Sequence, residues 1–167
     1  MDIKNKFLGQ FNIKNLFCLI IILSAFSFDR ITKLKIIKIQ IDDRSLFINE
    51  YVNLDLVWNT GIGFGLLSTD TNIAYNLISA LIFAVIIFLF YLISKSKMID
   101  KILFSLIIGG ALGNVYDRLT YSAVPDFIDI HYKNFHWFTF NIADIFITIG
   151  ILVLITKDLF LKNGKNL

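Results

Sequence analysis

The sequence predicts an all-α membrane protein with four transmembrane helices, a small β-containing segment outside the membrane and one helix at the membrane interface. Hydrophobic residues form 56% and charged residues 17% of the 167 positions, whereas soluble domains carry about 25% charged residues. This apolar excess is too large for one water-soluble core. The length fits a single domain, so we expect residues 1–167 to form one integral-membrane unit.

Four apolar stretches are the basis for the predicted helices, because a helix needs about 20 apolar residues to cross the hydrocarbon core. The first and third stretches reach that length only by continuing through charged residues, which hints at a functional role for those charges. The first stretch follows a basic start, but no small-residue cleavage site ends it, so we expect a retained helix rather than a signal peptide. The expected spans are about 15–33, 72–94, 101–119 and 138–157.

Lysines indicate the orientation of these spans. They occur in the amino-terminal segment, in the short loop between the second and third spans and in the carboxy-terminal tail. The positive-inside rule therefore predicts a multi-pass membrane protein with both termini in the cytoplasm. The outward segments are then about 34–71 and 120–137.

The first outward segment has valine, aromatic residues and alternating patterns that indicate short strands. An amphipathic helix at the interface is expected next to the second span.

Polar residues interrupt the apolar pattern near the outer ends of three spans. Asp29 and Lys33 are four apart, so they share a helix face and can pair; a structural ion pair explains them equally well. Gly110, Asn114 and Arg118 repeat every four residues on the third span. Such a glycine face can be a simple packing seam, but the neighbouring polar side chains favour a polar network that reaches the outer surface.

Asp144 is the most unusual of these residues, because it begins an apolar span without a lysine or arginine beside it in the sequence. Burial of an unpaired carboxylate costs several kcal/mol. The group should therefore hold a proton or share one with a second carboxyl. Asp126 and Asp129 precede it in the outward segment, so a pair of aspartates is the natural catalytic unit. In such a pair one carboxyl activates water and the other protonates the carbonyl oxygen.

Other chemistries find little support. The two histidines, His131 and His136, lie among aromatic residues and are expected to be interfacial side chains rather than ligands. No cluster has the ligand spacing of a zinc site and no glycine loop of a phosphate site is present, so we expect neither metal nor cofactor. The single cysteine, Cys18, excludes an internal disulfide. The net charge of +3 is not gathered into a basic run, so nucleic acid is not an expected partner.

Five motifs, in order along the chain, resemble those of the lipoprotein signal peptidase (signal peptidase II) family, which consists of aspartic peptidases. Each motif alone is weak, but the five together on four spans are specific. Ile62-Gly63 and Pro125 depart from the common family pattern without removing a reacting group. The motifs are Asp29–Lys33, Asn59–Gly65, Gly110–Arg118, Asp126–Asp129 and Phe140–Asp144.

The resemblance implies an endopeptidase that removes signal peptides from prolipoproteins, cutting before a cysteine that carries diacylglycerol, at the outer face of the cytoplasmic membrane. Its expected partners are these precursors, membrane lipids and the inhibitor globomycin. It implies that Asp126 and Asp144 are the catalytic pair. Roles in supporting the site or binding substrate are implied for Asp29, Lys33, Asn59, Gly61, Gly110, Asn114, Arg118, Asn141 and Ala143.

Two alternatives are compatible with the same residues. In a small four-helix transporter or scaffold, Asp29, Arg118 and Asp144 would form an ion path. An intramembrane protease of the Gly-x-Gly-Asp type is less suitable, because Gly61-Ile62-Gly63 is followed by Phe64.

Overall fold

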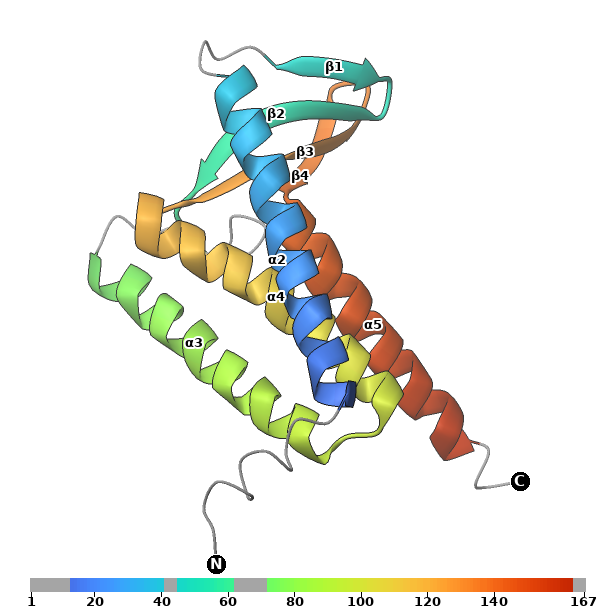
Figure 1. Cartoon of the computed structure of the whole chain (residues 1–167). Coiled ribbons are helices and arrows are strands. Elements are labelled where there is room, and N and C mark those ends of the chain that lie inside the picture. The colour runs from blue at the N-terminus through green and yellow to red at the C-terminus, as the bar shows by residue number, and fades with distance from the viewer. Residues whose placement is uncertain (1–12, 41–44, 62–71, 164–167) are drawn as a thin grey trace, which may run out of the picture.

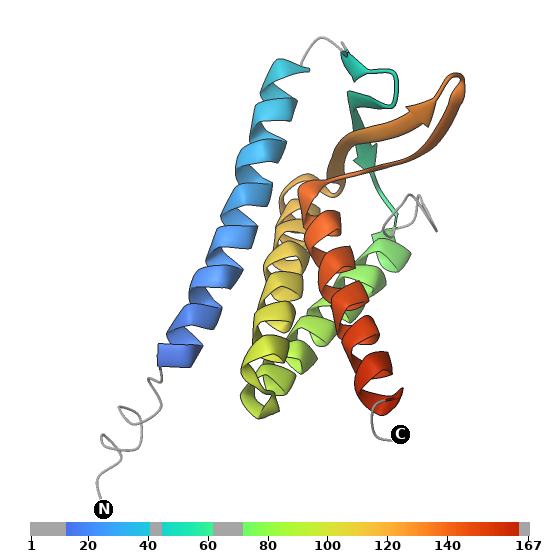
Figure 2. The ribbon, with the colours of Figure 1, turned by 90° about the vertical axis from the view of Figure 1, so that its right-hand side faces the viewer.

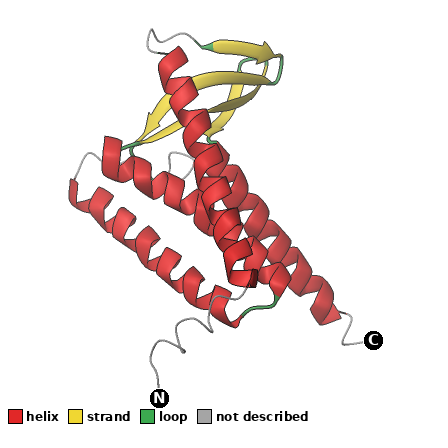
Figure 3. Cartoon of the chain, in the orientation of Figure 1, coloured by secondary structure: helices red, strands yellow, loops and turns green. Residues whose placement is uncertain are grey.

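Four helices and a four-stranded sheet make up the chain in a computed structural model that describes residues 13–40, 45–61 and 72–163 (Figure 1). The helices are α2 (Ile13–Ile39), α3 (Asn72–Lys95), α4 (Met98–Tyr121) and α5 (Ile142–Asn163). The strands are β1 (Leu46–Asn49), β2 (Val52–Asn59), β3 (Val124–Tyr132) and β4 (Phe135–Phe140). The protein is therefore predominantly helical, and the sheet lies at one end of the helices (Figures 1 and 3).

Helix α4 is the centre of the helical layer, because it packs against α2, α3 and α5. Two adjacent glycines allow the close approach. A Cβ atom on Gly109 would meet the Ile22 carbonyl oxygen of α2 at 2.7 Å, and one on Gly110 would meet the Ala143 carbonyl oxygen of α5 at 2.7 Å. The apolar core beside this contact includes Ile22, Ile86 and Ile108.

The helices have outer surfaces suited to lipid. Helices at Ile13–Ile39, Leu77–Lys95 and Met98–Tyr121 are long and apolar enough to cross a membrane. Large apolar side chains such as Leu81 and Phe88 are more than half exposed, which would be costly in water over so large a surface. Helix α5 does not meet the same criteria, since every 18-residue stretch within it holds more than two charged residues.

The sheet is antiparallel with strand order β1-β2-β3-β4. Strand β2 pairs with β3 so that Val57 lies opposite Asp126. Gln40, just after α2, fastens the sheet to the helices: its side-chain nitrogen donates to the Leu54 carbonyl at 2.6 Å, and its side-chain oxygen accepts from the Leu56 amide at 2.6 Å. Figure 2 shows α2 extending alongside the sheet, beyond the ends of α4 and α5.

The predicted strands in the first outward segment are confirmed as β1 and β2. Two helices have ends that differ from those of the expected spans. Helix α2 continues past residue 33 to Ile39, because apolar residues keep facing its neighbours at Ile36. The fourth helix begins at Ile142 rather than at residue 138, because the aromatic run Phe135–Phe140 pairs with β3 as a strand.

The remaining expectations on the fold have different outcomes. The expected small β-containing segment is more extensive than predicted, since the second outward segment also contributes strand structure. The expected interfacial helix before the second span falls on residues 62–71, which lie outside the described residues. After that span only Ser96 and Lys97 separate α3 from α4.

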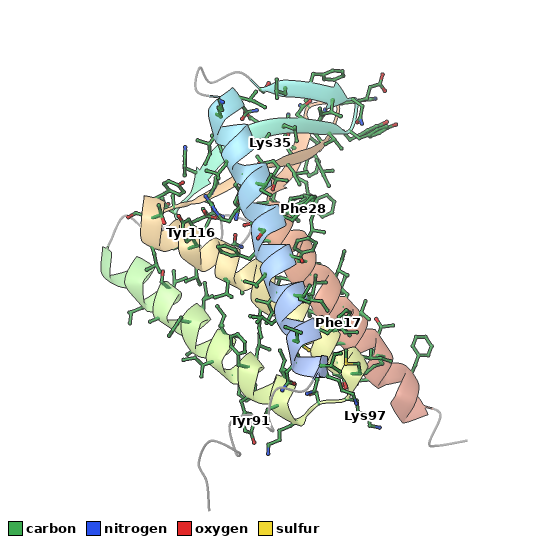
Figure 4. The ribbon with its side chains drawn as sticks, in the orientation of Figure 1. Phe17, Phe28, Lys35, Tyr91, Lys97 and Tyr116 are labelled. Atoms are coloured by element: carbon green, nitrogen blue, oxygen red, sulfur yellow. The ribbon has the colours of Figure 1, made fainter. Side chains whose placement is uncertain are left out.

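The two ends of the helical layer differ in chemistry. Tyr91 and Lys97 lie at the end away from the sheet, close to where α2 begins and α5 ends, while Lys35 lies beside the sheet (Figure 4). The polar side chains of α2, α4 and α5 that interrupt the apolar pattern all lie toward the sheet end. The candidate site is therefore at the junction between helices and sheet.

Candidate active site

Asp126 lies on β3 and is 2% exposed. Each of its carboxylate oxygens accepts one amide hydrogen bond. The Asn59 Nδ2 atom, from the end of β2, donates to Oδ2 at 2.8 Å, and the Asn141 Nδ2 atom donates to Oδ1 at 2.6 Å. Two residues from neighbouring elements thus fix the orientation of this carboxyl group.

Asn141 also caps α5. Its side-chain Oδ1 accepts from the Asp144 backbone amide at 3.1 Å, while its own backbone amide donates to Asp144 Oδ2 at 3.2 Å. This reciprocal pair is a capping box, which satisfies amides that would otherwise lack partners at a helix start. The carboxylate of Asp144 also benefits from the positive end of the helix dipole.

Asn141 therefore links the two aspartates that the motifs indicate, with one end of its side chain on each residue. The Asp144 Oδ1 atom accepts a further hydrogen bond from Asn114 Nδ2 of α4 at 2.9 Å. The two carboxyl groups influence one another electrostatically. Burial and, next, the negative charge of Asp144 raise the pKa of Asp126 to about 6, while hydrogen bonds from Asn59 and Asn141 oppose the increase.

A buried ion cluster lies behind this pair. Lys33 is fully buried, and its ammonium donates to Asp29 at 2.8 Å, to Asn114 Oδ1 at 2.8 Å and to Asp117 at 2.7 Å. Arg30 completes the cluster by an ion pair with Asp117. An ammonium with three oxygen partners is well compensated, whereas either aspartate without its cations would be costly in this place.

Asn114 and Asp29 connect this ion cluster to Asp144 and the residue beside it. Asn114 uses its oxygen for Lys33 and its nitrogen for Asp144. Asp29 Oδ1 accepts from the Ala143 backbone amide at 2.9 Å, directly beside Asp144 in the chain. Helices α2 and α4 therefore both determine where the first turn of α5 lies.

Arg118 holds the end of β2 against α4. Its guanidinium donates to the Asn114 carbonyl at 3.2 Å and to the Gly61 carbonyl at 3.1 Å. The Gly61 amide in turn donates to Asn59 Oδ1 at 2.8 Å. Because Asn59 contacts Asp126, this chain of contacts fixes the second side of the aspartate pair.

Two apolar clefts meet at Asp144. The larger, about 430 Å³, lies between α3, α4 and α5 and is lined by aliphatic side chains with Asn114, Arg118 and Asp144 at its polar part. The smaller, about 270 Å³, lies between α5 and the sheet and includes Phe138, Phe140 and Asp144. A bulky apolar ligand could therefore lie in either cleft with its polar part near the carboxyl group.

The structure brings all of the residues expected at the site into one network. Asp29 and Lys33 pair as their spacing predicted, and Gly110 lies against the Ala143 carbonyl. Asn59 and Gly61 contact Asp126 and Arg118, so they support the site itself.

Sequence reasoning assigned no role to Arg30 and placed Asp117 only in a general polar network with Asn114 and Arg118, although both lie within the motifs. Their positions in the sequence could have indicated their roles, because Arg30 adjoins Asp29 and Asp117 is three residues from Asn114 on the same face of α4. Both are buried, at 8% and 0% exposure. They complete the ion cluster around Lys33.

The two histidines differ from one another in exposure, since the His136 side chain is 56% exposed. The His131 side chain is 9% exposed and lies with His136 around Asp129, on the hairpin of β3 and β4. Their ligand atoms lie within 4.8 Å of one another.

Comparison with known proteins gives a consistent answer. The family model described as signal peptidase (SPase) II matches residues 21–160. The lipoprotein signal peptidase of Pelagibacter ubique (strain HTCC1062) is 49% identical over 161 residues, which cover 95% of this chain and 97% of that protein. The lipoprotein signal peptidase of Anaplasma phagocytophilum (strain HZ) is 38% identical over 156 residues, covering 92% and 98%.

Solved structures agree. A bacterial membrane enzyme determined by the in meso method at 1.9 Å resolution superposes with a TM-score of 0.71 at 29% identity, covering 84% of this chain and 90% of that one. A second such enzyme, at 2.3 Å resolution, gives a TM-score of 0.68 at 27% identity over 89% and 90%. With the family match extending from α2 to α5, the chain belongs to the signal peptidase II family.

Proposed function

We propose that the chain is an aspartic endopeptidase that removes signal peptides from diacylglyceryl-modified prolipoproteins, cutting before the lipidated cysteine at the outer face of the cytoplasmic membrane. The observation that carries this proposal is the junction at Asn141, whose side chain contacts Asp126 and Asp144 at the same time. Membership of the signal peptidase II family supports the reaction and the class of substrate.

In the proposed reaction one carboxyl of the pair is neutral and the other is ionised. The ionised carboxyl takes a proton from water as the water oxygen attacks the peptide carbonyl, and the neutral carboxyl donates its proton to the carbonyl oxygen. The pKa of Asp126, raised to about 6, supports this role because the pair then retains a proton at higher pH than separate aspartates do.

The substrate sites that we propose are the two clefts beside Asp144. Their aliphatic and aromatic lining suits lipid chains and the apolar part of a signal peptide. Burial of each lipid CH₂ contributes about 0.8 kcal/mol. Lipid attachment would therefore increase affinity and hold the scissile bond near the carboxyl groups.

For the membrane arrangement we propose four spanning helices within one domain over residues 1–167, with both termini in the cytoplasm. Lys97, between α3 and α4, lies at the end away from the sheet, and Lys95 and Lys101 flank it in the adjoining helix turns, which supports a cytoplasmic position for that end. In α5 the residues from 145 to 156 carry no charge, and charged residues lie toward its two ends. The sheet and Asp126 are then on the outer side.

The decisive test is cleavage by the purified full-length protein. We expect it to cut a diacylglyceryl-modified precursor peptide, to leave the same peptide without lipid intact, and to be inhibited by globomycin. Equal cleavage of both peptides would contradict the proposed specificity. A protein that cuts neither peptide would contradict the proposed activity.

The transporter or scaffold alternative is not favoured. Its ion path would need Asp29 in an open position, but Asp29 is fully buried and paired with Lys33. It lines neither of the clefts that contain Asp144.

A further inference from the structure

A second cluster of chemically reactive side chains lies on the hairpin of β3 and β4. Asp129 and His131 come from β3, and His136 comes from β4, where it lies directly opposite His131. One ligand atom from each of the three lies within 4.8 Å of the other two. The two imidazole rings are stacked, with centroids 5.2 Å apart.

The cluster is separate from the aspartate pair. Successive side chains of a strand point to opposite faces, and Asp126 and Asp129 are three residues apart on β3. Asp126 therefore lies on one face of the strand and Asp129 on the other. None of the contacts that hold Asp126 or Asp144 involves a histidine.

Asp129 is a buried carboxylate whose compensation comes from a hydrogen bond with His136 Nδ1 at 2.7 Å rather than from a lysine or arginine. Its side chain is 7% exposed. It forms no ion pair with lysine or arginine within residues 13–40, 45–61 and 72–163, and the titratable side chains beside it there are the two histidines. A buried carboxylate is stabilised by a cation beside it, and a metal ion would supply that charge here.

Two unused polar atoms lie beside this carboxylate. The His131 side chain is 9% exposed, and its Nδ1 atom, 3.7 Å from Asp129 Oδ2, has no hydrogen-bond partner within the described part of the chain. Asn53 lies directly opposite Asp129 on β2, and its Oδ1 atom is also buried without a partner there. Directly opposed residues of paired strands share a face, so both atoms flank Asp129.

We propose that Asp129, His131 and His136 bind a divalent transition-metal ion, with Zn²⁺ the ion that best fits these donors. Two imidazoles and one carboxylate form a known zinc donor set that keeps a fourth position open. In a tetrahedral site with bonds near 2.0–2.1 Å, neighbouring ligand atoms are about 3.3 Å apart. The Asp129 Oδ2 atom is 2.7 Å from His136 Nδ1 and 3.7 Å from His131 Nδ1. To form the site, the first distance must therefore increase slightly and the second must decrease slightly.

His136 has room to make those adjustments, because its side chain is 56% exposed. His131 is the fixed part of the site, because its backbone amide donates at 2.9 Å to the carbonyl of Tyr51, the turn residue just before β2. A bound ion would tie β4 to β3 at the outer end of the hairpin. Metal binding would thereby stabilise the strand that carries Asp126.

The experiment uses the full-length protein in detergent with any affinity tag removed, because a histidine tag would bind zinc. After treatment with a chelator, Zn²⁺ is titrated and the bound metal is measured by calorimetry and elemental analysis. We expect one equivalent to bind. His136→Gln should weaken binding by at least about 10-fold, and the double variant His131→Gln/His136→Gln, which has no histidine, should lose it.

A control variant and a measurement of thermal unfolding test whether zinc binds at these three residues. Asp126→Asn removes a carboxylate from the other face of β3 and should retain zinc binding. Added Zn²⁺ should raise the midpoint of thermal unfolding of the wild type and leave that of the double variant unchanged. If His131→Gln does not fold, the exposed His136 provides the test alone. Equal zinc affinity in the wild type and the His136→Gln variant would overturn the proposal, as would loss of binding in Asp126→Asn alone.

Discussion

The Asn141 side-chain amide donates to Asp126 Oδ1 at 2.6 Å, and this contact joins the sheet to the first turn of α5. The same side chain caps α5 through its oxygen. Helix formation and the arrangement of the aspartate pair therefore depend on one residue. The motif around Asn141 serves both functions, because a cap requires an acceptor and Asp126 requires a donor.

The direct prediction concerns the two aspartates. Asp126→Asn and Asp144→Asn should each reduce kcat for the lipidated peptide by at least about 100-fold, because each removes one proton-transfer group. Asn is nearly isosteric with Asp, so membrane insertion and chromatographic elution should stay unchanged. Cleavage assays at matched protein concentration test this. Wild-type kcat in either variant would exclude the paired mechanism.

A second prediction separates the two functions of Asn141. Asn141→Ala should lower the stability by about 1 kcal/mol through loss of the cap, and should lower kcat roughly 100-fold because Asp126 loses its orientation. Asn141→Ser is the matched control: serine can cap the helix but cannot donate an amide to Asp126. We therefore expect the Ser variant to keep most of the stability and to lose activity like the Ala variant. Thermal unfolding and peptide cleavage measure the two effects.

The third prediction concerns the buried ammonium of Lys33. Lys33→Met keeps the length of the side chain but leaves Asp29 without a cationic partner and Asp117 with Arg30 alone. Removal of one partner of a buried ion pair costs about 3–5 kcal/mol, so this variant should unfold at a much lower temperature or fail to accumulate. Lys35→Met is the same change at an exposed position of α2, and should alter stability by less than about 0.5 kcal/mol. Similar stability of the two variants would argue against the central role of the cluster.

Sequence patterns were sufficient for the parts of the site that depend on spacing within one helix. Asp29 and Lys33 pair because they are four residues apart, and Asn114 and Arg118 share a face of α4 for the same reason. The motif match placed Asp126 and Asp144 together, whereas spacing alone could not, because their contact runs through strand β3 and the cap at Asn141.

The strands of the second outward segment, β3 and β4, were missed, whereas those of the first were expected. Phe135–Phe140 is apolar enough to look like the start of a span, but it pairs with β3 in a register that involves Ile128 and Phe140. The same pairing brings His131 opposite His136. Strand register is set by turns and partner strands rather than by the residues of one segment alone, so neither the hairpin nor its cluster follows from local patterns.

The pH dependence of stability gives a fourth prediction. The pKa of Asp126 is raised by burial, and next by Asp144, to about 6 from its ordinary value of 3.8. Between these values the folded protein binds more protons at this group than the unfolded chain, so its contribution to stability falls as pH rises from about 4 to 6. A shift of this size corresponds to roughly 3 kcal/mol.

Asp126→Asn removes this titration, since asparagine resembles the protonated carboxyl. Thermal unfolding in detergent measures the difference in stability between the variant and the wild type. This difference should increase in favour of the variant as pH increases from 4 to 7. Asp55→Asn changes an exposed aspartate on the neighbouring strand and serves as the control. If the difference in stability between Asp126→Asn and the wild type is the same at pH 4 as at pH 7, the raised pKa of Asp126 is contradicted.

The close packing of α4 against α5 gives the last prediction. A Cβ atom on Gly110 would meet the Ala143 carbonyl oxygen at 2.7 Å and Ile147 Cγ1 at 3.2 Å, so Gly110→Ala must move α5 near Asp144. Gly109→Ala is the matched control, because its Cβ would meet Ala25 and Ile22 of α2 instead. Overpacking costs about 1–3 kcal/mol in both.

Activity per folded molecule distinguishes these two variants. Movement of a catalytic group by about 1 Å can cost roughly 100-fold in rate, so Gly110→Ala should lose far more kcat than Gly109→Ala at similar stability. Cleavage of the lipidated peptide, normalised to the folded fraction, measures the difference. Equal activity of the two glycine variants would mean that the α4–α5 distance does not control the aspartate pair, and that the contacts of Asn114 and Asn141 are sufficient to hold Asp144 in place.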